Sequence, residues 1–167
     1  MKERRLNEIK GVVLIAVGLI IFASLISFTP YDLSFYTSHP NVPAKNLIRT
    51  FGAYLAGVCL FLFGWASYLI GLLALFLGAK LFKQEKLDLR IPRIIGIVFF
   101  LLSISSIIGL SSDSNDIRSF SHGGALGFLA SNFVGAYFGK LGGYIIFITL
   151  ALLSFALVTE VMISAFL

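Results

Sequence analysis

The chain consists of long hydrophobic runs, each about the length of a membrane span, with polar segments between them. Long apolar runs cover residues 11–28, 51–79, 94–112 and 141–164, and polar or charged segments separate them. A membrane helix needs roughly 20 mostly apolar residues to cross a hydrocarbon core of about 30 Å. Because lipid cannot satisfy exposed backbone groups, such runs are expected to be helical. The pattern therefore predicts an all-α integral membrane protein with four transmembrane helices in a single membrane domain, residues 1–167.

Two stretches depart from this simple pattern. The second run would be about 43 Å long as one straight helix at 1.5 Å per residue, so it must tilt or begin outside the hydrocarbon core. Residues 122–138 are apolar and rich in small side chains, but they are short for a span and almost adjoin the fourth run. We expect a short interfacial or re-entrant helix there, because a fifth span would put the C-terminus outside. The glycines at Gly135, Gly139 and Gly143 predict either a packing ridge or a bend.

The composition supports a membrane location and excludes several other classes of protein. Hydrophobic residues make up 58% of the chain and charged residues 13%, and the mean hydropathy is +0.97. Ordinary soluble domains are about 45–50% apolar and about 25% charged. A water-soluble fold and an intrinsically disordered chain are therefore both excluded. A disulfide scaffold is excluded as well, since Cys59 is the single cysteine.

The basic residues predict the orientation of the spans. Nine lysines and arginines precede the first run or lie between the second and third, and four lie in the alternate segments. Cytoplasmic loops carry the excess of lysine and arginine, so both termini are predicted to lie inside. The net charge of +5 then reflects topology and contact with anionic lipid rather than binding of nucleic acid.

Small residues in the second run fall at heptad-like spacing. They predict a helix-packing seam, because small side chains let two helices approach closely in a membrane. The sequence leaves open whether this seam packs within one subunit or between subunits. Its members are Gly57, Gly64, Ser67, Gly71, Ala74 and Gly78.

No catalytic, cofactor-binding or metal site is predicted. His39, His122, Asp32, Asp113 and Asp116 lie outside the apolar core of the spans without short ligand spacing. Residues 135–141 resemble a phosphate-binding loop only superficially, because one spacer residue and the magnesium-binding hydroxyl are missing. No span has a charged residue near its middle, which argues against a transporter or a channel with a charged filter.

Short motifs bordering the spans resemble the N-terminal four-helix membrane domain of the FtsK/SpoIIIE family of DNA translocases. The resemblance covers nearly the whole chain and depends on the order and spacing of the motifs, since each one is short. Ile70-Gly71 departs from it, because many relatives have a proline after the Tyr-Leu pair. The matching stretches contain the motif residues Pro30, Asp32, Gly52, Tyr68, Gly123, Gly124 and Gly139, with Asn46 ahead of the second span.

The resemblance implies a membrane anchor at the division septum of a bacterial inner membrane. In that family a cytoplasmic motor forms hexamers, consumes ATP with magnesium and pumps double-stranded DNA during cell division and chromosome segregation. The family's linker and motor are absent from these residues, so DNA, ATP and magnesium are implied only for the motor. The implied partners are the lipid bilayer, further copies of the chain and membrane proteins of the division site. The alternatives are a stand-alone four-helix scaffold and, less favoured, a small transporter.

Overall fold

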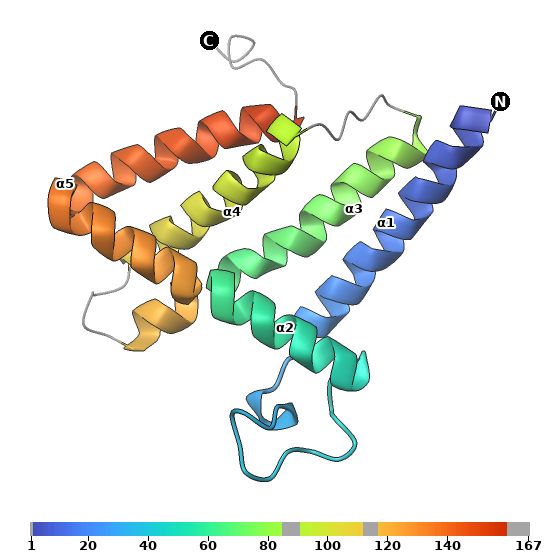
Figure 1. The fold of residues 1–167 in the computed structure, drawn as a ribbon, viewed down its shortest axis with the longest axis horizontal. Coiled ribbons are helices and arrows are strands. Elements are labelled where there is room, and N and C mark those ends of the chain that lie inside the picture. The colour runs from blue at the N-terminus through green and yellow to red at the C-terminus, as the bar shows by residue number, and fades with distance from the viewer. Residues whose placement is uncertain (1, 85–90, 112–116, 160–167) are drawn as a thin grey trace. The chain divides into compact units, whose positions relative to one another are not determined.

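The computed structural model describes residues 2–84, 91–111 and 117–159, and it leaves out the side chains of residues 2, 3 and 117–121. Every regular element within these ranges is helical (Figure 1). Residues 160–164, the end of the fourth predicted span, lie outside them. The helices are α1 (Lys2–Ile26), η1 (Pro30–Asp32), α2 (Arg49–Phe63), η2 (Gly64–Ser67), α3 (Tyr68–Phe82), α4 (Ile91–Ser111) and α5 (Ile117–Thr159).

Four helical stretches are long and apolar enough to cross a bilayer. They are Arg4–Ile26, Arg49–Phe82, Ile91–Ser111 and His122–Thr159, and their lengths are 23, 34, 21 and 38 residues. Their outer surfaces carry many exposed leucine, isoleucine, valine and phenylalanine side chains. Such surfaces suit lipid, which cannot hydrogen-bond to side chains or backbone. The predicted all-α class with four membrane-spanning helices is confirmed.

The second predicted span is broken in its middle. Gly64 has φ = 56°, and the 3-10 turn η2 separates α2 from α3. Figure 1 shows the two helices running in different directions from this point. Glycine adopts positive φ without the steric cost that a Cβ imposes. Residues 51–79 are therefore not one continuous helix, and a bend divides the long apolar run.

The chain forms two compact units, and the first consists of Met1–Leu60 with Ser67–Leu87. In it α1 and α3 pack antiparallel, as their contacting residues show. A Cβ added to Gly78 would lie 2.9 Å from the Ile15 backbone nitrogen, and one added to Gly18 would lie 3.1 Å from the Leu75 nitrogen. At the far end of the pair, the Gln84 side-chain amide donates to the Arg4 carbonyl at 3.0 Å. Close backbone contact at small residues holds this pair together.

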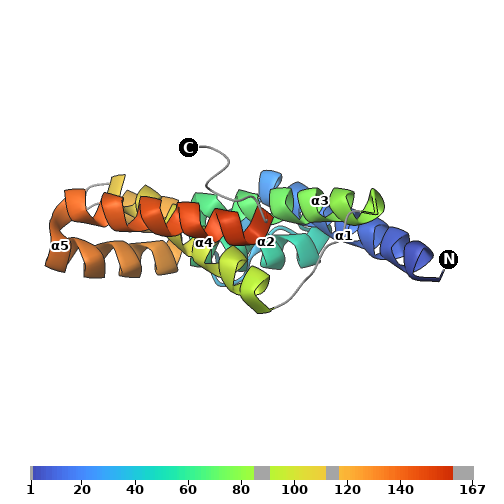
Figure 2. The same ribbon diagram turned by 90° about the horizontal axis from the view of Figure 1, so that it is seen from above.

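The second unit consists of Phe61–Ala66 and Asp88–Leu167, and α4 packs against α5 in it. α5 is interrupted at Gly124 (φ = 67°) and at Gly139 (φ = 69°). Figures 1 and 2 show it turning back on itself after the middle segment. The predicted short helix 122–138 is therefore interrupted near its start and ends at a bend. Of the two roles left open for the glycines around Gly139, the bend applies to Gly139 itself. Gly143 meets a side chain of α4, Leu110.

One local pattern of the backbone occurs twice along the chain. A long helix is followed by a connecting segment, a residue with positive φ, a short helix, a glycine bend and a returning helix. The positive-φ residues that belong to this pattern are Arg49 and Gly64 in the first copy and Gly124 and Gly139 in the second, and Gln84 after α3 lies outside the pattern. Both pairs are 15 positions apart, and 75 positions separate the two copies. The chain therefore contains a tandem structural repeat with a shared register.

Candidate functional site

The segment between α1 and α2, which we call the outer loop (residues 27–48), is organised around one carboxylate. Asp32 is 5% exposed. One of its oxygens accepts hydrogen bonds from the Asn41 side-chain amide (2.8 Å) and the Lys45 backbone N–H (2.9 Å). The other accepts the Asn46 backbone N–H at 2.8 Å. These three bonds tie the beginning of the loop to its end, so the loop has a defined shape.

The protonation of Asp32 follows from this environment. Burial raises the pKa of the carboxyl group, but the three donated hydrogen bonds and the charge of Lys45 lower it. The second effect is larger, and the pKa of Asp32 lies below its ordinary value. A carboxylate that accepts several N–H groups is stabilised in its charged form. Asp32 is therefore ionised, and its charge is compensated locally.

Asn46 connects the outer loop to both neighbouring helices. Its side-chain amide donates to the Ser24 carbonyl at 2.8 Å, near the end of α1. Its side-chain oxygen accepts the Ile48 backbone N–H at 3.0 Å, just ahead of α2. A Cβ at Gly52 would lie 2.7 Å from the Ser24 hydroxyl, so glycine is needed for this approach. The motif residues Asp32, Asn46 and Gly52 therefore form one structural unit.

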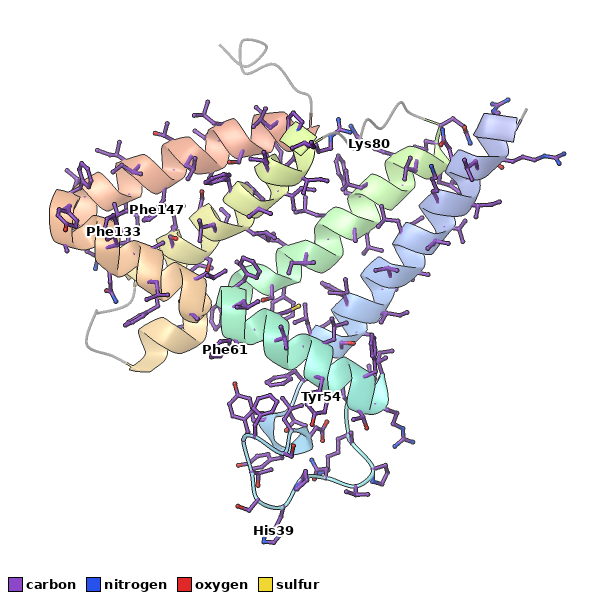
Figure 3. All side chains as sticks on the ribbon, in the orientation of Figure 1. His39, Tyr54, Phe61, Lys80, Phe133 and Phe147 are labelled. Carbon is purple, nitrogen blue, oxygen red and sulfur yellow. The ribbon has the colours of Figure 1, made fainter. Side chains whose placement is uncertain are left out.

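Aromatic side chains project from this frame. Tyr31, Phe35 and Tyr36 are exposed on the loop, and Tyr54 is exposed on α2. The Tyr54 ring lies 5.9 Å from the Phe35 ring, and Figure 3 shows Tyr54 beside the loop. Aromatic residues with polar edges are enriched at membrane–water interfaces. The outer loop therefore presents an aromatic surface suited to the lipid interface or to another membrane protein.

A surface cavity lies at the other end of the outer loop. Its volume is about 440 Å³, and it is lined by Pro43, Ala44, Lys45, Asn46, Leu47 and Arg49. Asn46 is fixed by the hydrogen bonds above, whereas Leu47 is 70% exposed. The cavity therefore combines a rigid wall with an accessible apolar side chain.

The structure distributes the predicted packing seam over three elements. Gly57 lies on α2, where a Cβ would meet Leu33 of the outer loop, 2.6 Å away. Gly64 is at the bend. The Ser67 hydroxyl donates to the Cys59 carbonyl at 2.5 Å and so connects the chain across the break. Gly71, Ala74 and Gly78 lie on α3, where Gly71 and Gly78 face α1.

The other motif residues also occupy structural positions. Pro30 begins the short helix η1, where its fixed φ is favourable. The Tyr68 hydroxyl donates to the Leu25 carbonyl at 3.3 Å, near the end of α1. Gly123 and Gly124 lie at the first interruption of α5, where a Cβ on Gly123 would come within 3.0 Å of the Ser105 carbonyl on α4. These residues shape the turns and helix contacts of the fold, and they supply no group suited to catalysis.

The described residues assemble no group of three or more histidine, cysteine, aspartate or glutamate side chains. Both oxygens of Asp32 are already used by backbone and amide donors. His39 lies at the tip of the outer loop (Figure 3). Asp113 and Asp116 lie outside the described residues.

Sequence reasoning did not detect the repeat or the roles of two serines. Ser24 and Ser105 each lie opposite a glycine of the following short helix, Gly52 and Gly127. The detectable signal was a Phe-Gly pair that follows each of these glycines at the same distance, at residues 63–64 and 138–139. A Phe-Gly pair within apolar sequence is a weak sign of a repeat. The repeat becomes clear only from the backbone conformation, which is the same at corresponding positions.

The fold and its apolar surfaces define a multi-pass α-helical membrane protein. A family model described as the 4TM region of DNA translocase FtsK/SpoIIIE matches residues 3–167, so the chain belongs to this family. It is 29% identical to the DNA translocase FtsK of Shewanella oneidensis over 95% of its length. It is 30% identical to that of Azospirillum brasilense over 89% of its length, and 31% identical to that of Rickettsia prowazekii over 88%. No solved structure matches it.

The chain corresponds to only part of these relatives. It spans 18% of the Shewanella protein, 26% of the Azospirillum protein and 19% of the Rickettsia protein. The matched portion is the four-helix membrane region. The spanning helices and these relatives together identify a multi-pass protein of the bacterial inner membrane.

Proposed function

We propose that this domain anchors a DNA translocase in the inner membrane at the division septum. The observation that carries the proposal is the family match over residues 3–167, together with four helices able to span the bilayer. In this role the domain tethers a cytoplasmic, ATP-driven motor that pumps DNA during cell division and chromosome segregation. ATP and magnesium would be bound by that motor, and DNA would be contacted through it.

Topology supports the role. Four crossings return the chain to the side on which it began, and lysine and arginine are enriched at the N-terminus and between the second and third spans. By the positive-inside rule both ends are cytoplasmic. A motor attached after the fourth span would then lie with the chromosome, and the outer loop would face the periplasm. Its aromatic surface is suited to division-site membrane proteins.

Cysteine labelling in cells tests the topology. Cys59→Ala supplies a background without thiols, and either His39→Cys on the outer loop or Lys83→Cys after α3 is added. We expect an impermeant maleimide to label position 39 in intact cells and position 83 only after permeabilisation. Labelling of position 83 in intact cells would reverse the orientation and refute a cytoplasmic motor attachment.

The anchoring role itself is tested on the native gene. An antibody against residues 80–93 should detect a membrane protein several times larger than the 18.2 kDa of this chain, and a fluorescent tag on that gene should gather at midcell. A band near 18 kDa spread around the envelope would instead indicate a stand-alone membrane scaffold, and the translocase role would be withdrawn.

A further inference from the structure

The glycine bend occurs twice, and the two copies differ in what covers them. We call residues 62–66 the first elbow and residues 137–141 the second elbow. Each contains a Phe-Gly pair, and the glycines have φ = 56° at Gly64 and φ = 69° at Gly139. The short helix before each elbow also exposes apolar side chains at matching positions, such as Val58 and Phe133. The elbows are therefore equivalent parts of the repeat.

The first elbow is covered. A Cβ placed on Gly64 would lie 2.6 Å from the Gly124 backbone nitrogen and would also strike the His122 carbonyl. The rings of Trp65 and His122 are 4.5 Å apart between centroids. Gly64 is buried and Ala66 is 1% exposed. The first elbow thus packs its backbone directly on residues 122–124.

None of the described residues covers the second elbow in this way. A Cβ on Gly139 would have nothing within 4 Å. Tyr137 is 74% exposed, Phe138 62% and Leu141 77%. Repeat proteins bury each repeat against its neighbour through equivalent surfaces. The second elbow carries the surface that the first elbow buries, and the described residues leave it exposed.

The repeat also indicates what would cover it. Residues 122–124, which receive the first elbow, correspond to residues 47–49 in the first copy of the repeat, 75 positions earlier. Arg49 has φ = 55° and Gly124 has φ = 67°, so the backbone has the same unusual conformation at both places. Leu47, which corresponds to His122, is exposed and lines the surface cavity of about 440 Å³. The part of the chain that the structure describes therefore contains one elbow left uncovered and one accessible receiving segment.

We propose that the second elbow of one chain docks on residues 47–49 of a second copy of the same chain. The contact repeats, between molecules, the packing that the first elbow makes within one molecule. It is heterologous, because two different surfaces meet, and heterologous contacts build closed rings or open arrays. This assembly does not depend on the anchoring role proposed above, and its test can fail without affecting that role.

Single-cysteine chains test the contact directly. Cys59→Ala is the background, one tagged chain carries Leu47→Cys and a differently tagged chain carries Lys140→Cys. These positions correspond to His122 and Trp65, whose rings are in contact. When the two chains are co-expressed in membranes and mildly oxidised, we expect a disulfide-linked heterodimer carrying both tags. Neither chain alone should form a comparable homodimer, because the two surfaces differ.

Two controls make the result specific. Leu153→Cys on the returning part of α5 replaces Lys140→Cys as a matched exposed position, and it should not cross-link to position 47. Adding Tyr137→Ala and Phe138→Ala should abolish the adduct between positions 47 and 140. Absence of that adduct when both chains are present in the membrane would overturn the proposal and indicate a lipid-facing elbow. A homodimer through position 140 of equal yield would overturn it as well, since it would indicate a symmetric contact.

Discussion

The contact between α1 and α3 makes a prediction that depends on the exact position of two glycines. A Cβ added to Gly78 would lie 2.7 Å from the Ile15 side chain, 2.9 Å from the Ile15 backbone nitrogen and 3.0 Å from the Gly11 carbonyl. A Cβ added to Gly71 would lie 3.3 Å from the Phe22 side chain. Backbone cannot move aside as a side chain can, so alanine should be tolerated at Gly71 and not at Gly78.

The expected magnitudes follow from two opposing effects. Replacing glycine by alanine in a helix gains up to about 1 kcal/mol of intrinsic propensity. Inserting extra volume into a packed contact costs about 1–3 kcal/mol. At Gly71 a shift of a few tenths of an ångström relieves the contact, so Gly71→Ala should change the free energy of unfolding by less than about 1 kcal/mol. At Gly78 the two helices must separate, and Gly78→Ala should lose about 1–2 kcal/mol net.

The assay is unfolding of the purified chain in mixed detergent micelles, followed by the fluorescence of Trp65, its single tryptophan. Gly11 supplies a further check, because a Cβ there would lie 2.9 Å from the Gly78 carbonyl, so the two glycines face each other. Once one substitution has separated the helices the second costs less, and the double variant should lose less than the sum of the single variants. Equal losses for Gly71→Ala and Gly78→Ala, with simple additivity of Gly11→Ala and Gly78→Ala, would refute this packing register.

Three further outcomes are expected. Gly64→Ala should destabilise the purified chain by about 3 kcal/mol, since the positive φ costs about 1–2 kcal/mol and overpacking against His122 adds more. Gly139→Ala should incur only the cost of the positive φ, because no described atom lies within 4 Å of the added Cβ. Equal thermal unfolding temperatures for the two variants would contradict this difference. Asp32→Asn should make the outer loop more sensitive to protease at pH 7, because one carboxylate oxygen that accepts an N–H is replaced by a donor. The pKa of Asp32 is lower in the folded chain than in the unfolded chain, so the ionised carboxylate stabilises the folded loop above pH about 4, and this stabilisation is lost as the pH falls below that value. Protease cleavage of the wild-type loop should therefore rise on acidification, while cleavage of Asp32→Asn changes little. Equal responses of the two chains to acid would refute this role.

The four spans could be predicted because hydrophobic run length is a direct physical requirement of the bilayer. The bend at Gly64 could not, although the second run was recognised as too long. The residues on both sides of Gly64 are equally apolar, and glycines are common in membrane helices without bends. What fixes the bend is the packing of Gly64 against residues 122–124, about 60 positions away in the sequence. Long-range packing of this kind leaves no local pattern.

The repeat was missed for a related reason. Arg49 and Gly124 share a left-handed backbone conformation but no residue type, and the serines at 24 and 105 are single small residues in apolar helices. The glycines at 52 and 127 are the same in both copies, because a Cβ would strike a serine of the preceding helix in each. The two copies therefore share their backbone conformation and the close contact between a glycine and the preceding helix, while the residues on their outer surfaces differ.

The outer loop shows how structural and contacting roles are separated among neighbouring residues. Asp32 and Asn46 are buried and have their hydrogen bonds satisfied within the chain, so a partner could not reach them without dismantling the loop. Tyr31 and Phe35 lie beside them and are 66% and 61% exposed. Substitutions at the buried pair would change the surface of the loop by deforming its backbone. Substitutions at the aromatic pair would change that surface while leaving the backbone of the loop intact. Asp32 and Asn46 thus determine the shape of the loop, and this shape presents the exposed aromatic residues at its surface.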